Sequence, residues 1–89
     1  MASYKIVWKQ SAQKELRKLP KEAVHRIIGL IAALSDNPAP PGAKKLAGTE
    51  SIFRARTGDY RVVYNIVKDV LVVEVIRVGH RKDIYRRPL

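Results

Sequence analysis

The residues of this sequence best suited to chemistry are three arginines, Arg54, Arg56 and Arg61. They flank a Gly58-Asp59 dipeptide, which is typical of a tight turn between two strands. Alternate side chains of a strand share a face, so Arg54 and Arg56 point the same way, and pairing across the turn brings Arg61 beside them. Like charges this close repel one another unless an anion binds between them. Because guanidinium groups donate paired hydrogen bonds to phosphate oxygens, the segment predicts a binding site for a phosphodiester backbone.

The charge of the whole chain supports this interpretation. The 89 residues carry a formal net charge of +10, which indicates an acidic partner. Lysines prevail in residues 1–50 and arginines in residues 51–89, where most strands are expected. A lysine on a helix is usually solvated, whereas an arginine on a strand is held in place for paired contacts. A protein that is merely soluble and basic remains the alternative.

Other features of the composition exclude several classes of protein. The sequence has no cysteine, which excludes disulfides and thiolate metal sites. The start of the chain leads directly into a strand pattern, without an apolar signal region or an apolar run of about 20 residues that could span a membrane. The acidic residues are few and scattered, so we predict no metal and no cofactor. We expect a soluble, cytoplasmic protein without a membrane partner.

Hydrophobic periodicity predicts a single domain over residues 1–89. Alternation predicts a first strand over residues 4–8, and helical spacing of apolar residues predicts two helices over residues 11–19 and 20–35. The short Leu19-Pro20 link favours an antiparallel helical hairpin. After a proline-rich loop, alternation predicts strands over residues 51–57, 60–67 and 71–78, and then a short helical or irregular C-terminal tail. The expected fold class is α+β, a helical hairpin packed on a small antiparallel sheet in the order β-α-α-β-β-β.

Strand parity assigns the two faces of this sheet. The face expected under the helices carries Tyr60, Val62, Tyr64 and Ile66. The opposite face mixes the arginines with apolar residues, namely Val63, Val72, Ile76 and Val78. An apolar patch on an open sheet indicates a protein partner, unless the C-terminal tail folds over it. Both possibilities stay open from the sequence.

Five motifs spread over nearly the whole chain are typical of one family of proteins. They are Tyr4-x-Ile6-x-Trp8, Ala12-x-x-x-Leu16-x-x-Leu19-Pro20, Lys45-Leu46-x-Gly48, Phe53-Arg54-x-Arg56-x-Gly58-Asp59-Tyr60-Arg61-Val62-Val63-Tyr64 and Val78-Gly79-His80-Arg81-x-Asp83-x-Tyr85. With these motifs the chain resembles the RelE/ParE toxin superfamily, and its RelE-type branch in particular. The last two motifs are the most specific.

The resemblance implies a toxin of a type II toxin–antitoxin system. RelE-type members are ribosome-dependent endoribonucleases, or mRNA interferases, that cut mRNA in the A site and so inhibit translation. Each is neutralised by a small antitoxin encoded beside it, and the complex binds its own promoter DNA. ParE relatives share the fold but target DNA gyrase, and the motif over residues 79–85 favours the nuclease branch. A gyrase inhibitor and a nucleic-acid-binding module without chemistry remain the alternatives.

Carried over by position, the resemblance places the catalytic residues at Arg54, Arg56, Arg61, Arg81 and Tyr85. Metal-independent cleavage uses the 2′-hydroxyl as the nucleophile on the adjacent phosphorus, and it needs a base, charge stabilisation and a proton for the 5′-oxygen. We expect Arg61 to stabilise the developing charge and Tyr85 to stack on a base. A surface arginine, and an aromatic residue that only packs the tail, are the corresponding alternatives.

The proton acceptor is the open question in this chemistry. The best-known relatives have lysines where this chain has Arg54 and Arg56, and an arginine keeps its proton. Histidine is the residue type that exchanges protons near neutral pH, so His80 becomes a candidate acid or base. A packing or capping role for His80 is the alternative.

Overall fold

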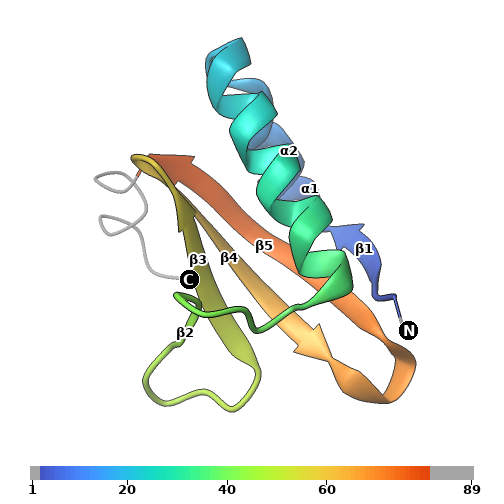
Figure 1. Cartoon of the computed structure of the whole chain (residues 1–89). Helices are drawn as coiled ribbons and strands as arrows, with labels where there is room; N and C mark the ends of the chain where they lie inside the picture. Colours follow the sequence, from blue (N-terminus) through green and yellow to red (C-terminus); the bar gives the residue numbers. More distant parts are fainter. Residues whose placement is uncertain (1–2, 81–89) are drawn as a thin grey trace.

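The computed structural model describes residues 3–80, in which two helices pack on a five-stranded mixed sheet (Figure 1). The strand order across the sheet is β1-β5-β4-β3-β2. In chain order the elements are β1 (Lys5–Trp8), α1 (Gln10–Arg17), α2 (Lys21–Asp36), β2 (Lys44–Lys45), β3 (Ile52–Thr57), β4 (Tyr60–Val67), the short 3-10 helix η1 (Lys68–Val70) and β5 (Val72–His80). The predicted C-terminal tail, with Arg81 and Tyr85, lies outside the described residues.

The two helices form because each carries an apolar stripe at helical spacing. The stripe of α2 consists of the buried residues Ala23, Ile27, Ile31 and Leu34. On α1, Ala12 is fully buried and Leu16 packs against the core. The helices run in opposite directions in Figure 1, where α2 crosses the sheet, and α1 contacts β5. The predicted helical hairpin on a sheet is therefore confirmed.

The sheet departs from the prediction at its two edges. Strands β3, β4 and β5 form the expected antiparallel meander, but β1 pairs with β5 in parallel. Both helices and the β3–β4 hairpin separate β1 from β5 along the chain, so no local turn fixes their relative direction. At the opposite edge, Lys44 and Lys45 form a short additional strand that pairs with β3, in a segment for which we had predicted no strand.

A β-bulge in β5 changes the predicted faces near the end of that strand. Val63 pairs with Arg77 and Tyr64 pairs with Val75, so Ile76 has no partner residue on β4. One extra residue reverses the alternation beyond it. Val78, which we expected on the face away from the helices, instead pairs with Val62 in the core and is 1% exposed.

The core lies between the helices and one face of the sheet, as parity predicted. Val62, Tyr64 and Ile66 of β4 are buried there against α2. On the opposite face, Val63 of the predicted apolar patch is buried, at 3% exposed, whereas Val72 and Ile76 are partly exposed. The alternative that the tail covers this patch concerns residues outside the described range. Within residues 3–80, the helices are too short or too polar to cross a membrane.

Candidate functional site

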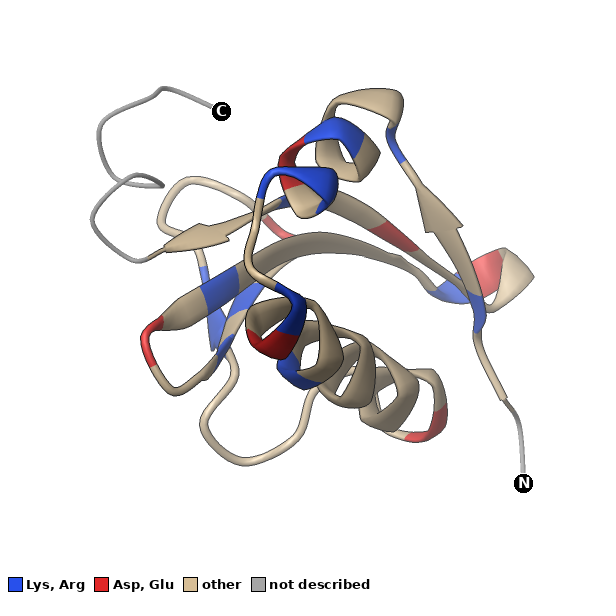
Figure 2. Ribbon diagram, turned by 90° about the horizontal axis from the view of Figure 1, so that it is seen from above, with Lys and Arg blue, Asp and Glu red and all other residues tan. Residues whose placement is uncertain are grey.

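The β3–β4 hairpin brings the three predicted arginines onto one face of the sheet. Arg56 lies directly opposite Arg61, and Arg54 lies opposite Val63. Residues opposite each other in an antiparallel pair point to the same face, here the face away from the helices. Gly58 makes the turn possible, because its φ of 60° is a conformation that other residues rarely adopt. Figure 2 shows basic residues on both strands of this hairpin.

Lys44 is a fourth cation on this face, and sequence reasoning missed it. It pairs with Arg54 across β2 and β3, so the two side chains leave the same face. Its neighbour Lys45 pairs with Phe53 and therefore points to the opposite face. Lys44, Arg54, Arg56 and Arg61 are together called the cationic face below. The sequence signal was the Lys44-Lys45 pair itself, but only the register decides which of the two lysines joins the arginines.

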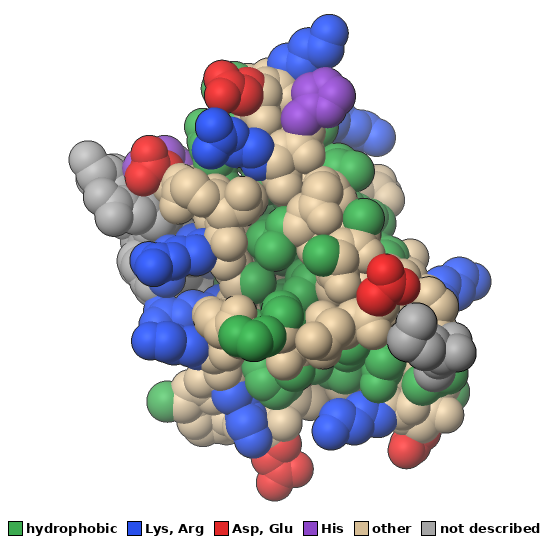
Figure 3. All heavy atoms as spheres, viewed as in Figure 1, with side chains coloured by type: hydrophobic (Ala, Val, Ile, Leu, Met, Phe, Trp, Pro, Cys, Tyr) green, Lys and Arg blue, Asp and Glu red, His purple; other side chains and the backbone are tan. Residues whose placement is uncertain are grey.

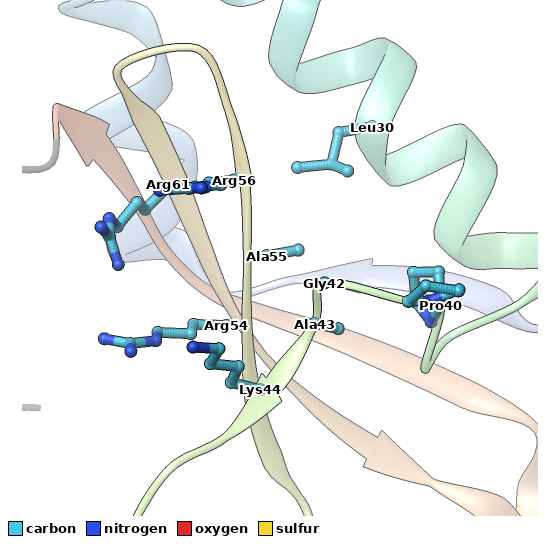
Figure 4. Close-up of a pocket in the computed structure, with 10 residues that line it drawn as sticks. Leu30, Pro40, Gly42, Ala43, Lys44, Arg54, Ala55, Arg56 and Arg61 are labelled. Carbon is cyan, nitrogen blue, oxygen red and sulfur yellow. The ribbon is translucent and has the colours of Figure 1, made fainter.

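A groove of about 430 Å³ opens beside the cationic face, at the edge of β3 (Figure 4). All four residues of the cationic face line it. The rest of its lining is apolar or small: Leu30, Pro40, Pro41, Gly42, Ala43 and Ala55. The groove exists because β2 pairs with β3 only as far as Arg54, and the chain that precedes Lys44 leaves the sheet toward α2.

Two hydrogen bonds hold the proline-rich wall of this groove. The Tyr64 hydroxyl donates to the Pro38 carbonyl at 2.6 Å, and the Ala43 N–H donates to the Pro40 carbonyl at 3.0 Å. Burial raises the pKa of Tyr64 to about 12, because the phenolate would lose its hydration. The hydroxyl therefore remains a donor at physiological pH. The buried ring of Tyr64, stacked on Phe53, thus fixes a loop that follows α2.

His80 does not lie with the arginines, contrary to our expectation. It pairs with Tyr60, and their rings meet edge to face with centroids 5.7 Å apart. Tyr60 packs against the core, on the face that the helices cover. The β-bulge at Ile76 explains the difference, because it reverses the faces of the residues that follow it and so places His80 on the face of Tyr60, while Gly79 lies opposite Arg61.

Arg77 lies opposite Val63 and so on the same face of the sheet as Arg54, but it is buried, does not line the groove and contacts α1. Its Nη2 donates to Oε2 of Glu15 at 3.4 Å, and the Val78 N–H donates to Oε1 of the same carboxylate at 3.2 Å. Because β1 pairs with β5 only as far as Val75, the N–H of Val78 would otherwise lie at an open sheet edge. Glu15 on α1 therefore closes this edge and neutralises Arg77.

The arrangement on the cationic face suits phosphate binding. Lys44 faces Arg54 and Arg56 faces Arg61, so two pairs of like charges lie side by side. An anion bound between such like charges lowers their repulsion, and together the four side chains offer several charged donors to phosphate oxygens. Among residues 3–80, no three His, Asp or Glu side chains are grouped so that they could hold a metal ion.

Comparison with known proteins gives a consistent result along most of the chain. The family model described as "ParE toxin of type II toxin-antitoxin system, parDE" matches residues 6–85. Toxin RelG of Mycobacterium tuberculosis is 36% identical over 88 residues, which are 94% of this chain and 98% of that protein. Toxin RelE of the same organism is 31% identical over 84 residues, which are 93% of this chain and 87% of that protein.

Solved structures of two toxin–antitoxin complexes resemble the fold described above. The RelBE2 complex of Mycobacterium tuberculosis contains a chain with a TM-score of 0.79 and 30% identity, covering 89% of this chain and 99% of that one. The intact RelBE complex of E. coli contains a chain with a TM-score of 0.78 and 28% identity, covering 88% of this chain and 96% of that one.

Proposed function

The chain belongs to the ParE toxin family of type II toxin–antitoxin systems, within its RelE-type superfamily, and from this premise we propose that it is a ribosome-dependent endoribonuclease. It cleaves mRNA in the A site and so inhibits translation. The single observation that carries this proposal is the cationic face, on which Lys44 and three arginines point together from three adjacent strands. A phosphodiester backbone is the anion that matches such a row of charged donors.

The reaction that suits this face is attack of the 2′-hydroxyl on the adjacent phosphorus. The O2′–P bond forms and the P–O5′ bond breaks, leaving a cyclic phosphate and a free 5′-hydroxyl. One proton leaves the 2′-hydroxyl and another reaches the departing 5′-oxygen. Between these two proton transfers negative charge develops on the phosphorane, and preorganised cations lower the activation barrier by stabilising that charge. Arg61 is half-buried on β4, the strand that lies between β3 and β5, and it is the best candidate for this role.

Arg54 and Arg56 bind the flanking phosphate oxygens in this proposal, and neither can serve as a base, because an arginine keeps its proton. His80 faces Tyr60 on the other side of the sheet, which favours the packing role over proton transfer. The proton acceptor then comes from the ribosome or from water. This dependence explains why the ribosome is needed. Arg81, as a further phosphate ligand, and Tyr85, as a stacking side chain, complete the proposed site.

A cognate antitoxin is the proposed protein partner. The relatives in the RelBE complexes are bound to antitoxins, and this chain has the same fold. With a net charge of +10, it attracts an acid-rich segment, and the toxin–antitoxin complex is proposed to bind its own promoter DNA. The proposed location is the cytoplasm, where ribosomes and mRNA are found.

The experiment that tests this function is cleavage on programmed ribosomes, followed by primer extension. We expect cuts within the A-site codon and little cleavage of the same RNA without ribosomes. Rapid degradation of the free RNA would contradict the proposal that cleavage depends on the ribosome.

The family model's description as a ParE toxin makes inhibition of DNA gyrase the second candidate. A gyrase supercoiling assay on the same preparation separates the two. Inhibited supercoiling with intact mRNA would assign the chain to gyrase, and RNA binding without either activity would leave a non-catalytic module.

A further inference from the structure

We propose that the groove at the edge of β3 is a subsite for one nucleotide of the RNA strand. Its phosphate binds Lys44 and Arg54, and its base lies against Leu30, Pro40 and Ala43. This inference deepens the proposed function, on which it rests in part. It adds a residue, Lys44, and a wall, the proline-rich segment, that sequence reasoning had not placed in the site.

The phosphate half of the subsite follows from the register of β2. Lys44 and Arg54 are opposite each other, and both line the groove. Figure 4 shows their side chains extending side by side, on the same side of β3 as Arg61. A lysine and an arginine in this position offer donors from two strands to one phosphate group. Lys45 points to the other face and cannot take part.

The base half follows from what lines the remainder of the groove. Leu30 approaches from α2, Ala55 from β3 and Ala43 from the segment before β2, and the lining there has no charged side chain. The volume of about 430 Å³ lies in the roughly 300–1,000 Å³ range of small-ligand sites. A flat base can be buried against such apolar side chains. In Figure 3 basic side chains line one margin of the molecule, beside a band of hydrophobic ones.

The wall is fixed before the ligand arrives. Tyr64 holds the loop through the Pro38 carbonyl, and the Ala43 N–H closes a turn onto the Pro40 carbonyl. A preformed wall loses little conformational entropy on binding. Single-stranded RNA is therefore favoured over a protein segment as the occupant. The groove combines an apolar part, large enough for a base, with a row of cationic side chains that can bind phosphates.

The position of the subsite predicts a role in choosing where the RNA is cut. Arg56 and Arg61 also line the groove, next to Lys44 and Arg54. A nucleotide in the groove therefore neighbours the phosphate that Arg61 contacts in the proposed reaction. The fit of its base against Leu30 and Ala43 then influences which sequences are cleaved.

The test is an NMR titration of the full-length chain, labelled at methyl groups and at backbone amides. The probes are inorganic phosphate, adenosine 5′-monophosphate and a single-stranded RNA tetranucleotide. We expect phosphate to shift the backbone amides of the cationic face without shifting the methyl groups of the groove, and both nucleotide probes also to shift the methyl groups of Leu30, Ala43 and Ala55. The tetranucleotide binds more tightly, because Arg56 and Arg61 contact its adjacent phosphates.

Two matched pairs of variants locate the site. Lys44→Ala should weaken nucleotide binding about tenfold, the effect of losing one charge-assisted hydrogen bond, while Lys45→Ala should leave it unchanged. Ala43→Leu fills the groove and should remove the shifts at Leu30, whereas Ala39→Leu, on the exposed part of the same loop, should not. Equal effects within either pair would overturn the subsite.

Further outcomes distinguish the possible occupants. Tighter binding of the mononucleotide than of the tetranucleotide would make the groove a site for free nucleotides and overturn its role in RNA. Loss of antitoxin binding in Ala43→Leu, with RNA contacts intact, would assign the groove to the antitoxin. The titration needs no cleavage, so shifts in the groove of a chain that fails to cut mRNA would refute the proposed function alone. Cleavage by a chain whose groove binds no nucleotide would refute the subsite alone.

Discussion

Arg56 on β3 and Arg61 on β4 lie directly opposite each other across the hairpin, so two guanidinium groups project together from the face of the sheet away from the helices. Lys44 and Arg54 repeat the arrangement one pair further along. Directly opposed like charges repel each other, and an anion bound between them lowers that repulsion. The two pairs therefore make this face of the sheet suited to anion binding.

Arg61→Ala should lower the rate of cleavage on programmed ribosomes by about a hundred- to a thousandfold, the usual effect of losing one group that stabilises transition-state charge. Folding should be retained, because Arg61 lies outside the core cluster. The measurement is a single-turnover rate, with thermal unfolding as the check on folding. Lys68→Ala removes the same charge from an exposed position in η1 and is the control. An equal loss in both variants would show that only net charge matters.

At least one of Arg54→Lys and Arg56→Lys should cleave faster than the parent chain. A lysine in the cationic face can release its proton, whereas an arginine cannot, and the surrounding cations favour that release. The measurement is the single-turnover rate at increasing pH, where a lysine base gains activity. Arg17→Lys, on the exposed side of α1, should change nothing. Lower rates for both variants at every pH would show that the guanidinium geometry matters more than proton transfer.

His80→Ala should leave the cleavage rate unchanged between about pH 6 and 8, the range in which a histidine titrates. The reason is that the ring of His80 contacts Tyr60, so His80 lies on the face of the sheet that faces away from Arg61. Loss of this edge-to-face contact should lower the free energy of unfolding by about 0.5–1.5 kcal/mol. Chemical denaturation measures that effect. A pH-dependent fall in rate without a change in stability would return His80 to the catalytic residues.

Glu15→Ala should destabilise the fold by about 1–3 kcal/mol, because it leaves the N–H of Val78 and the buried guanidinium of Arg77 without this acceptor. Glu22→Ala is the matched control. Glu22 pairs with Arg26 on the exposed side of α2, and such surface pairs contribute about 0.3–0.5 kcal/mol. Urea denaturation of the two variants compares them directly. Equal destabilisation would show that Glu15 does not seal the edge of β5.

Tyr64→Phe should remove a pH dependence of stability at alkaline pH. The pKa of Tyr64 is raised from 10.0 to about 12, so between these values the folded state holds a proton that the unfolded state has lost. The stabilisation is complete below pH 10 and is lost as the pH rises toward 12. It amounts to about 2–3 kcal/mol for the two-unit shift.

Urea denaturation at about pH 9 and pH 11.5 measures this difference between the parent chain and Tyr64→Phe. Lysines and other tyrosines titrate in both proteins and cancel in the comparison. At neutral pH the variant should lose only about 1 kcal/mol, for the hydrogen bond to the Pro38 carbonyl. Parallel pH profiles for the two proteins would contradict the shift.

The sequence by itself determined the features that depend on neighbours along the chain. Gly58-Asp59 makes a tight turn, and a tight turn fixes the register of its two strands, so the common face of Arg54, Arg56 and Arg61 could be predicted from parity. The apolar stripe of α2 and the alternation in β4 likewise predicted Ile27, Val62 and Tyr64 as core residues. Local geometry sufficed for each of these.

Only the tertiary structure decided the features that join distant segments. Lys44 enters the cationic face because β2 meets β3 across a loop whose register no turn signal fixes. The bulge at Ile76 moves His80 to the face away from Arg61, because one unpaired residue reverses the face of every residue beyond it. The alternating valines of this strand do not predict the position of a bulge. Glu15 reaches Val78 only after α1 has docked on β5. In each case the free energy of long-range packing, which local sequence patterns do not encode, selects the register.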